Sequence, residues 1–267
     1  MPDHIEHSVS GQYKTSANLT ARNDLHARYG TSTVEWHVWV YDHLGLSREE
    51  SVLELGCGPA WLWQRNMDRL PPALRMLLSD SSQAMVQEAW EHVRDHVPTA
   101  RYAVCDAQAL PLESKSFDLV IANHMLYHVA DIRTALGEIE RVLKVGGRLV
   151  ASTIGRDHMK ALRDLATEFD PSFGSDNQLA EYFGLETGQD RLEEYFEGVT
   201  VHRHEDALVV TEAQPLAAYV VSTGRGHAVQ ERQDDFLQFL TRRIKEAGPV
   251  HIPKDSGLFR ATRRRPA

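Results

Sequence analysis

The chain has 267 residues, 42% of them hydrophobic and 25% charged, which is the composition of a globular protein with enough apolar surface for a core. Its formal net charge of −9 disfavours nucleic acid as a partner, because proteins that bind DNA or RNA usually present a basic face to the phosphates. No apolar run reaches the roughly 18–20 residues that span a bilayer, and the amino terminus lacks the features of a secretory signal, so no membrane association and a cytoplasmic location are expected.

The amino-terminal segment, residues 1–50, is predicted to be a helical cap in front of the main domain. Leu19, Leu25 and Tyr29 follow helical spacing, and a second apolar group extends over residues 34–44. Residues 30–32, Gly-Thr-Ser, predict a break between two helices, with a helix N-cap inside the break.

Between Ser51 and Gly155, short apolar runs alternate with longer helical stretches. The predicted strands are 52–55, 74–78, 102–105, 117–122 and 148–153, and the predicted helices are 60–70, 82–97 and 131–143. Strands and helices that alternate at this spacing indicate βαβ units, and right-handed crossovers place helices on both faces of the sheet. The sequence therefore predicts an α/β fold with a doubly wound, mainly parallel, Rossmann-like sheet.

After Gly155 the pattern changes to a helical insertion at 156–198, which is expected to cover the carboxyl edge of the sheet. Its aromatic residues, such as Phe173, Tyr182 and Phe183, fit either a core or the wall of a pocket. Residues 199–267 are predicted to return to the sheet, with a strand over 199–210, helices near 213–221 and 229–247, and a possible last strand near 258–260. Residues 1–267 are therefore expected to form one domain, with 51–155 as its ligand-binding core.

The strongest local signal is a glycine turn at the end of the first predicted strand. Gly56 and Gly58, one residue apart, let the backbone turn sharply and let a ligand approach without meeting a Cβ atom. A nicotinamide dinucleotide site continues to a third glycine, but this chain has Trp61 in that region. Glu54, in the strand before the turn, is expected to repel a phosphate and to suit a cationic ligand.

Two acids follow at the ends of the next strands. Asp80 ends the second strand, where a carboxylate can accept both hydroxyls of a ribose, although Asp80 and Ser82 also fit a helix N-cap. Asp106 ends the third strand and can bond the exocyclic amine of a purine. Glycines and acids at three successive strand ends predict a binding site at the point where the strand order reverses.

These residues resemble the class I S-adenosylmethionine-dependent methyltransferase family. The resemblance extends over about Ser51 to Thr153 and rests on five motifs in order: 54–59 (Glu-Leu-Gly-Cys-Gly-Pro), 80–85 (Asp-Ser-Ser-Gln-Ala-Met), 105–111 (Cys-Asp-Ala-Gln-Ala-Leu-Pro), 117–120 and 143–149. It implies S-adenosyl-L-methionine as the cofactor and methyl transfer as the activity. One departure is Ala60, where many members have a third glycine; a slightly tighter turn without loss of binding is expected.

The resemblance also implies roles for individual residues. Gly56 and Gly58 would approach the methionine part of the cofactor, and Asn123, after the fourth strand, would border it. Asp80, with Ser81 beside it in the second motif, would hold the ribose, and Asp106 with Ala107 would meet the adenine. Tyr13 and Arg22, in the amino-terminal segment, fit contacts to the cofactor carboxylate, although ordinary surface positions suit them equally well. Trp61 and Trp63 are expected to pack against the amino-terminal cap.

Three histidines are candidates for a general base in methyl transfer. His124 and His128 follow the fourth predicted strand, and His158 opens the insertion. Imidazole titrates near neutral pH and can take a proton from an alcohol or an amine. A purely structural role is the competing interpretation, especially for His128, and the sequence favours none of the three.

The acceptor is expected to be a small molecule methylated on oxygen or nitrogen, because the chain is acidic and no basic domain is attached. The alternatives are a methyltransferase acting on protein or RNA, a binding module without activity, and nicotinamide-dependent hydride transfer. No metal site is expected: Cys57 and Cys105 lack metal-binding spacing, and His202 and His204 are interpreted as surface residues. The arginines near 260–265 are interpreted as a solvated tail. The oligomeric state stays open.

Overall fold

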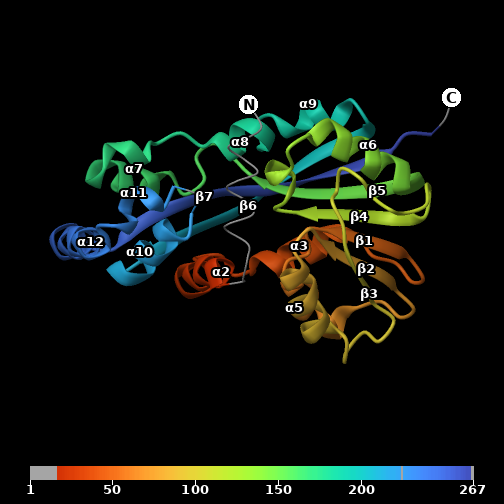
Figure 1. The fold of residues 1–267 in the computed structure, drawn as a ribbon, viewed down its shortest axis with the longest axis horizontal. Helices are drawn as coiled ribbons and strands as arrows, with labels where there is room; N and C mark the ends of the chain where they lie inside the picture. Colours follow the sequence, from red (N-terminus) through yellow and green to blue (C-terminus); the bar gives the residue numbers. More distant parts are fainter. Residues whose placement is uncertain (1–16, 224, 266–267) are drawn as a thin grey trace.

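The structure, a computed structural model, describes residues 17–223 and 225–265. Its centre is one seven-stranded sheet with the strand order β3-β2-β1-β4-β5-β7-β6 (Figure 1). The strands are β1 (Ser51–Leu55), β2 (Arg75–Asp80), β3 (Arg101–Val104), β4 (Phe117–Asn123), β5 (Leu143–Ile154), β6 (Phe196–Val210) and β7 (Val250–Arg263). β1 to β5 are parallel, whereas β7 is antiparallel to both β5 and β6. The predicted mainly parallel α/β fold is confirmed.

Helices cover both faces of the sheet. The helices of the chain are α2 (Ala17–Tyr29), α3 (Trp36–Leu44), α4 (Trp61–Gln64), α5 (Gln83–Val93), α6 (Ile132–Val142), α7 (Lys160–Phe169), α8 (Gln178–Phe183), α9 (Gly188–Glu193), α10 (Ala213–Val221), α11 (His227–Gln230) and α12 (Gln233–Ala247), with 3-10 turns at η1 (Met67–Arg69), η2 (Leu126–His128) and η3 (Pro171–Phe173). α3, α4 and α5 pack on one face, and α6, α8 and α9 on the other (Figure 1). Among residues 17–223 and 225–265, no helix has the length and apolar character needed to cross a bilayer.

The two faces of the sheet have separate cores. Leu53, Leu55 and Val120 face α6, whereas Val52 and Leu119 face α3, so the strands are apolar on both sides, as expected for buried parallel strands. Trp63 belongs to the second core and is fully buried with Val40 and Leu44 of α3, as predicted from its position after the glycine turn. Burial of a side chain of this size contributes about 2–3 kcal/mol.

Side-chain caps explain where the helices of the sheet domain begin. Ser82 caps α5 by accepting from the backbone N–H of Met85, and Asp131 caps α6 by accepting from Arg133 and Thr134. The start of α3 differs from the prediction. Its cap is Glu35, whose carboxylate accepts from the N–H groups of His37 and Val38, and not a residue of the 30–32 break.

A third core lies beyond the sheet, in a part we call the helical lobe: α2, α7, α10, α11 and α12. Figure 1 shows α7, α10, α11 and α12 gathered at one end of the long β6–β7 pair. Buried residues from all parts of the lobe form its core: Leu25, Met159, Leu162, Leu216, Val229, Phe236, Leu240 and, from the strands, Leu208 and Ile252. The ribbon of β6 and β7 therefore belongs both to the sheet and to the lobe.

The structure corrects several predicted boundaries. The helix expected at 60–70 is the short α4 followed by the turn η1, and the last strand extends over 250–263 instead of 258–260. The 156–198 insertion divides: α7 joins the lobe, whereas α8 and α9 pack beside α6. Phe173 and Phe183 are core residues, and the Tyr182 hydroxyl donates to Ala130 O, 2.9 Å away. The grouping of the whole chain into one domain stays a prediction.

Candidate active site

The glycine turn after β1 has the geometry that a bound ligand requires. Gly56 and Gly58 both have positive φ, +63° and +52°. A Cβ at Gly56 would lie 2.7 Å from Met125 Cβ, whereas a Cβ at Gly58 would meet no atom within 4 Å. Gly56 is thus required by packing, and Gly58 leaves open space at the carboxyl end of β1. Ala60 also has positive φ, +61°, which is a conformation that glycine adopts more readily.

Asp80 is held at the end of β2 with its carboxylate beside this turn. One oxygen accepts from the N–H of Gly58 at 3.0 Å and the other from the N–H of Ser82 at 2.9 Å. Burial raises the pKa of Asp80, and the backbone donors oppose that effect. Each oxygen keeps a further lone pair, which fits two ribose hydroxyls. Ser81, exposed next to it, lies at the same edge of the sheet.

Glu54 differs from its expected role as an anion. It is buried in β1 and accepts a 2.5 Å hydrogen bond from Trp63 Nε1. Burial raises the pKa of Glu54 to about 8, so the side chain is mainly neutral at pH 7. The burial of strand β1 on both faces thus favours the neutral carboxyl group, and the expected role of Glu54 as a partner for a cation stays a prediction. Its contact with the cofactor stays a prediction.

Asp106 and Ala107 follow β3 at the same edge of the sheet. Ala107 is buried, whereas Asp106 is exposed and accepts from both the backbone N–H and the side-chain amide of Gln108 at 2.9–3.1 Å. The Asp80 carbonyl accepts from Cys105 N–H at 3.1 Å, so the two acidic strand ends have fixed spacing. The placement of adenosine beside Asp80, Asp106 and Ala107, and of the methionine part near Gly58, stays a prediction.

Asn123 and His124 lie where β4 ends, and β5 positions both of them. Ser152 Oγ donates to Asn123 Oδ1 at 2.6 Å and accepts from the His124 N–H at 2.9 Å. His124 has a φ of +54°, a conformation that non-glycine residues rarely adopt and that is found mostly in tight turns and functional sites. The chain thus turns sharply after β4 and directs His124 away from the strand.

Three histidines, from three separate parts of the chain, lie near each other beyond β4 and β5. The His26 and His158 rings have centroids 6.3 Å apart, and the His124 ring stacks on Trp36 with centroids 4.7 Å apart. In each of these histidines Nδ1 is buried and has no hydrogen-bond partner. Burial, followed by nearby charges that include Lys254, lowers the pKa of His26 and His124 to about 3 and that of His158 well below its ordinary value. The three imidazoles are neutral at pH 7.

Three further residues were predicted from the sequence to belong to the site: His128, Arg22 and Tyr13. His128 lies in η2, half-buried, and burial together with the charge of Arg22 lowers its pKa to about 4. Arg22 donates to the hydroxyl and carbonyl oxygens of Ser222 after α10, which ties α2 to the lobe. Tyr13 lies outside the described residues. The roles of His128 and Arg22 stay predictions.

Several residues of this region were not predicted from the sequence. His204, interpreted above as a surface residue, is only 5% exposed, and its ring packs against those of Trp36 and Trp39. That interpretation is wrong because α3 covers this face of β6. Lys254 and Asp206, also missed, form an ion pair with side-chain exposures of 7% and 5%. The opposite charges of Asp206 and Lys254 could have predicted this pair. That prediction would have needed the pairing register of β6 and β7, which are far apart in the sequence.

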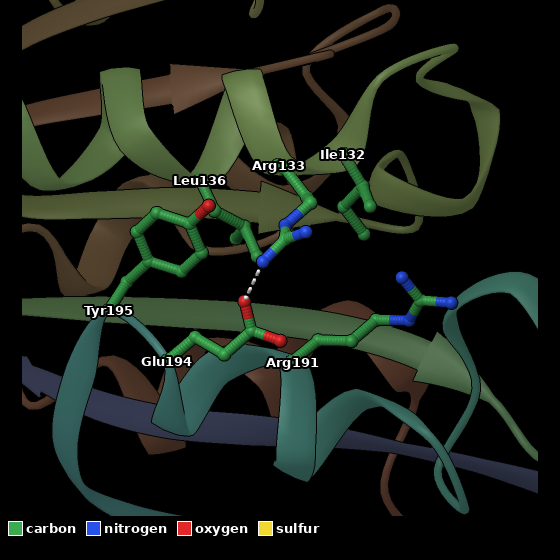
Figure 2. A pocket seen from close by; sticks show the side chains of 6 residues that line it. All are labelled: Ile132, Arg133, Leu136, Arg191, Glu194 and Tyr195. Carbon is green, nitrogen blue, oxygen red and sulfur yellow. Dashed lines mark hydrogen bonds and ion pairs between the residues drawn. The ribbon is translucent and has the colours of Figure 1, made fainter.

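A separate pocket lies on the outer side of α6 and α9, away from the glycine turn. Figure 2 shows Ile132, Arg133 and Leu136 of α6 facing Arg191, Glu194 and Tyr195, with an ion pair of 2.8 Å between Arg133 and Glu194. None of the sequence-predicted site residues lines it. Within residues 17–223 and 225–265, no group of three or more His, Cys, Asp or Glu side chains is arranged to hold a metal ion.

Comparisons with known proteins agree with this geometry. The family model described as "Methyltransferase domain" matches residues 53–151. Malonyl-(acyl-carrier protein) O-methyltransferase of Hahella chejuensis is 37% identical over 42% of this chain and 40% of its own length. Ubiquinone/menaquinone biosynthesis C-methyltransferase UbiE of Enterobacter sp. is 30% identical over 56% of this chain and 57% of its own. The chain thus spans less than two thirds of these relatives.

A solved structure gives the same fold. The YcgJ protein of Bacillus subtilis superposes with a TM-score of 0.57 at 18% identity, over 86% of this chain and 98% of that protein. The matched segment, 53–151, contains the glycine turn, both acidic strand ends and the His124 turn. Residues 53–151 therefore match the methyltransferase-domain family, and this part of the chain is similar to S-adenosylmethionine-dependent methyltransferases.

Proposed function

We propose that this chain transfers the methyl group of S-adenosylmethionine to an oxygen or nitrogen atom of a small molecule. The observation that carries the proposal is the position of three neutral imidazoles, His26, His124 and His158, beyond the strand ends that follow the cofactor turn. The cofactor supplies a methyl group on a positively charged sulfur. Neutral imidazoles can lie near that charge without repelling it, which protonated histidines cannot.

The site supports a mechanism based on positioning. S-Adenosylmethionine, when bound, would supply the methyl group, and the residues of this chain would hold the acceptor atom in line with it and accept the proton that the acceptor loses. Holding the two reactants in line contributes up to roughly 7–11 kcal/mol in favourable cases. An imidazole with its pKa lowered to about 3 is free to accept a proton but is a weak base, so positioning is the larger effect.

His124 is the leading candidate for the base, with His158 and His128 as the others. His124 follows β4 directly, its backbone N–H is fixed by Ser152, and its Nδ1 has no partner. His158 lies beside His26 across the same region. These roles are distinguished by single alanine variants, with exposed His96→Ala as the control. A base contributes about 10²–10⁴-fold to the rate, whereas a packing role leaves the rate per folded protein nearly unchanged.

Two experiments test the proposal. Calorimetric titration with S-adenosylmethionine, S-adenosylhomocysteine and NAD should give micromolar binding of the first two and none of NAD; binding of NAD alone would overturn the cofactor assignment. Incubation with methyl-labelled S-adenosylmethionine, a small-molecule extract and a protein fraction should then label the small molecules. Label in the protein fraction alone would instead support a macromolecular acceptor.

A further inference from the structure

The feature that the proposed function leaves unused is the buried ion pair between Lys254 and Asp206. The two residues face each other in the β6–β7 register, and Lys254 Nζ lies 2.5 Å from Asp206 Oδ2. Side chains of facing residues point to the same side of a ribbon, and successive residues alternate. Lys254 and Asp206 therefore share the inner face with His204 and Ser256, next to the histidines described above.

Asp206 has its hydrogen-bonding capacity largely filled. It accepts from the backbone N–H groups of Thr31, Ser32 and Ala207 at 2.8–3.0 Å as well as from Lys254. Among the residues that the structure describes, Asp206 is the one hydrogen-bond partner of Lys254. An ammonium group has three donors, so Lys254 keeps two for another group. The carboxylate thus holds the lysine in place without using all its donors.

Several polar side-chain atoms in this part of the structure are buried and have no hydrogen-bond partner. Trp36 Nε1 and Ser256 Oγ are buried and unpartnered, as are the Nδ1 atoms of His26, His124, His158 and His204. Lys254 is among the groups whose charge lowers the pKa of all three imidazoles, and the carboxylate of Asp206 acts in the opposite sense on His26. An excess of positive charge with buried N–H and O–H donors suits an anion.

We propose that the methyl acceptor carries a carboxylate, which Lys254 binds, so that Lys254 determines the specificity of the enzyme for acidic small molecules. The inference rests on the proposed function, because it places the acceptor beside His26, His124 and His158. A carboxylate is favoured over a phosphate because Lys254 presents one cationic group, whereas Arg22 and Arg163 already donate to Ser222 and to the carbonyls of Ser175 and Arg156.

The test is a calorimetric titration of the full chain, saturated with S-adenosylhomocysteine, using four probes of matched shape: benzoate, phenyl phosphate, benzamide and benzylamine. The aromatic carrier suits a region in which Trp36 stacks on His124. Benzoate should bind at least tenfold more tightly than benzamide, and benzylamine should not bind. Equal binding of benzamide, tighter binding of phenyl phosphate or benzylamine, or no binding of benzoate would each overturn the proposal.

Two variants show whether Lys254 causes the preference. Lys254→Met should reduce the benzoate-to-benzamide ratio to about one. Arg203→Met should leave it unchanged, because Arg203 pairs with Asp255 on the opposite, outer face of the same ribbon. A ratio that survives Lys254→Met contradicts the assignment. If that variant does not fold with Asp206 unpaired, the double variant Lys254→Met/Asp206→Asn removes both charges.

Binding of S-adenosylhomocysteine distinguishes a failure of the carboxylate-acceptor proposal from a failure of the proposed methyltransferase function. S-Adenosylhomocysteine should bind the wild type, Lys254→Met and Arg203→Met within twofold of one another, because neither residue lies at the glycine turn. Absence of S-adenosylhomocysteine binding to the wild type contradicts the proposed function itself. Normal S-adenosylhomocysteine binding without a preference for benzoate contradicts the carboxylate-acceptor proposal and leaves the cofactor assignment intact.

Discussion

The ring of His124 lies against the ring of Trp36 with a centroid separation of 4.7 Å and an interplanar angle of 29°. His124 directly follows β4 near the centre of the sheet, and Trp36 begins α3 in the amino-terminal segment. The contact joins the turn that carries the leading candidate base to a helix that packs on one face of the sheet. Trp36 and His124 are 88 residues apart in the sequence, and their contact brings these two parts of the chain together.

A double-mutant cycle measures this contact. His124→Ala and Trp36→Leu should each lower the free energy of unfolding, and the double variant should lose about 0.5–1.5 kcal/mol less than the sum, because aromatic pairs contribute about that much. His124→Asn should be more stable than His124→Ala, since asparagine tolerates a φ of +54°. Additive losses in chemical unfolding would show that the stack contributes no energy.

The Asp80→Ala variant is expected to bind S-adenosylmethionine at least tenfold more weakly while it still unfolds cooperatively. Hydrogen bonds from ribose hydroxyls to a charged group contribute about 1.5–3 kcal/mol, and 1.4 kcal/mol is tenfold in affinity. Asp95→Ala is the matched control, because Asp95 is exposed and contacts only Arg94 among its described ion pairs. Unchanged affinity in calorimetry would remove Asp80 from the ribose site.

The two glycines of the turn should respond differently to alanine. Gly56→Ala is expected to lower stability by more than about 2 kcal/mol, because its positive φ is disfavoured for alanine and its Cβ would overlap Met125. Gly58→Ala should lower stability by only about 1 kcal/mol, since space is open there, yet it should weaken cofactor binding strongly. Thermal unfolding and calorimetry on both variants separate the effects; equal stability losses would contradict the difference in packing.

The buried Glu54 predicts a pH dependence of stability. Because burial raises its folded pKa from 4.5 to about 8, the neutral form is favoured in the fold, and stability is fully present below pH 4.5 and is lost as pH rises through 8. Glu54→Gln keeps an acceptor for Trp63 and removes the titration. Its free energy of unfolding should rise relative to wild type by about 2 kcal/mol between pH 6 and pH 8. A difference that is constant over this range would show that Glu54 is ionised in the fold.

Much of the sheet was predictable because its signals are local. The first two parallel strands are short apolar runs that end at a glycine and at an acid, and α5 and α6 start at the polar caps Ser82 and Asp131. For the same reason, Gly58 and Asp80 could be placed at one edge from their positions after successive strands. The cofactor side of the site therefore follows from a segment of about a hundred residues, 53–151, which is the segment that the family model matches.

The proposed acceptor side was not predictable from the sequence, because its residues come from distant segments. His26 and Lys254 meet only when α2 reaches the β6–β7 ribbon, through hydrogen bonds from Thr31 and Ser32 to Asp206. Alternation along β6 predicted that His202 and His204 share a face, but not that α3 covers it. Strand β7 was underestimated since its first half, which contains Pro253 and Lys254, pairs with β6 alone and lacks the continuous apolar run of a central strand.

The continuity of β6 and β7 from the sheet into the helical lobe limits how the protein can open. The two strands pair continuously from the Thr200 and Arg260 pair to the Val210 and Val250 pair. They therefore form a rigid connection and not a hinge. The lobe cannot swing away from the sheet unless that ladder bends along its length. The helix α2 is fixed to the same frame by an isolated bridge at Gly30, by hydrogen bonds to Asp206 and Ser222, and by Leu25 in the core of the lobe, so sheet, lobe and α2 are held together by the β6–β7 ribbon.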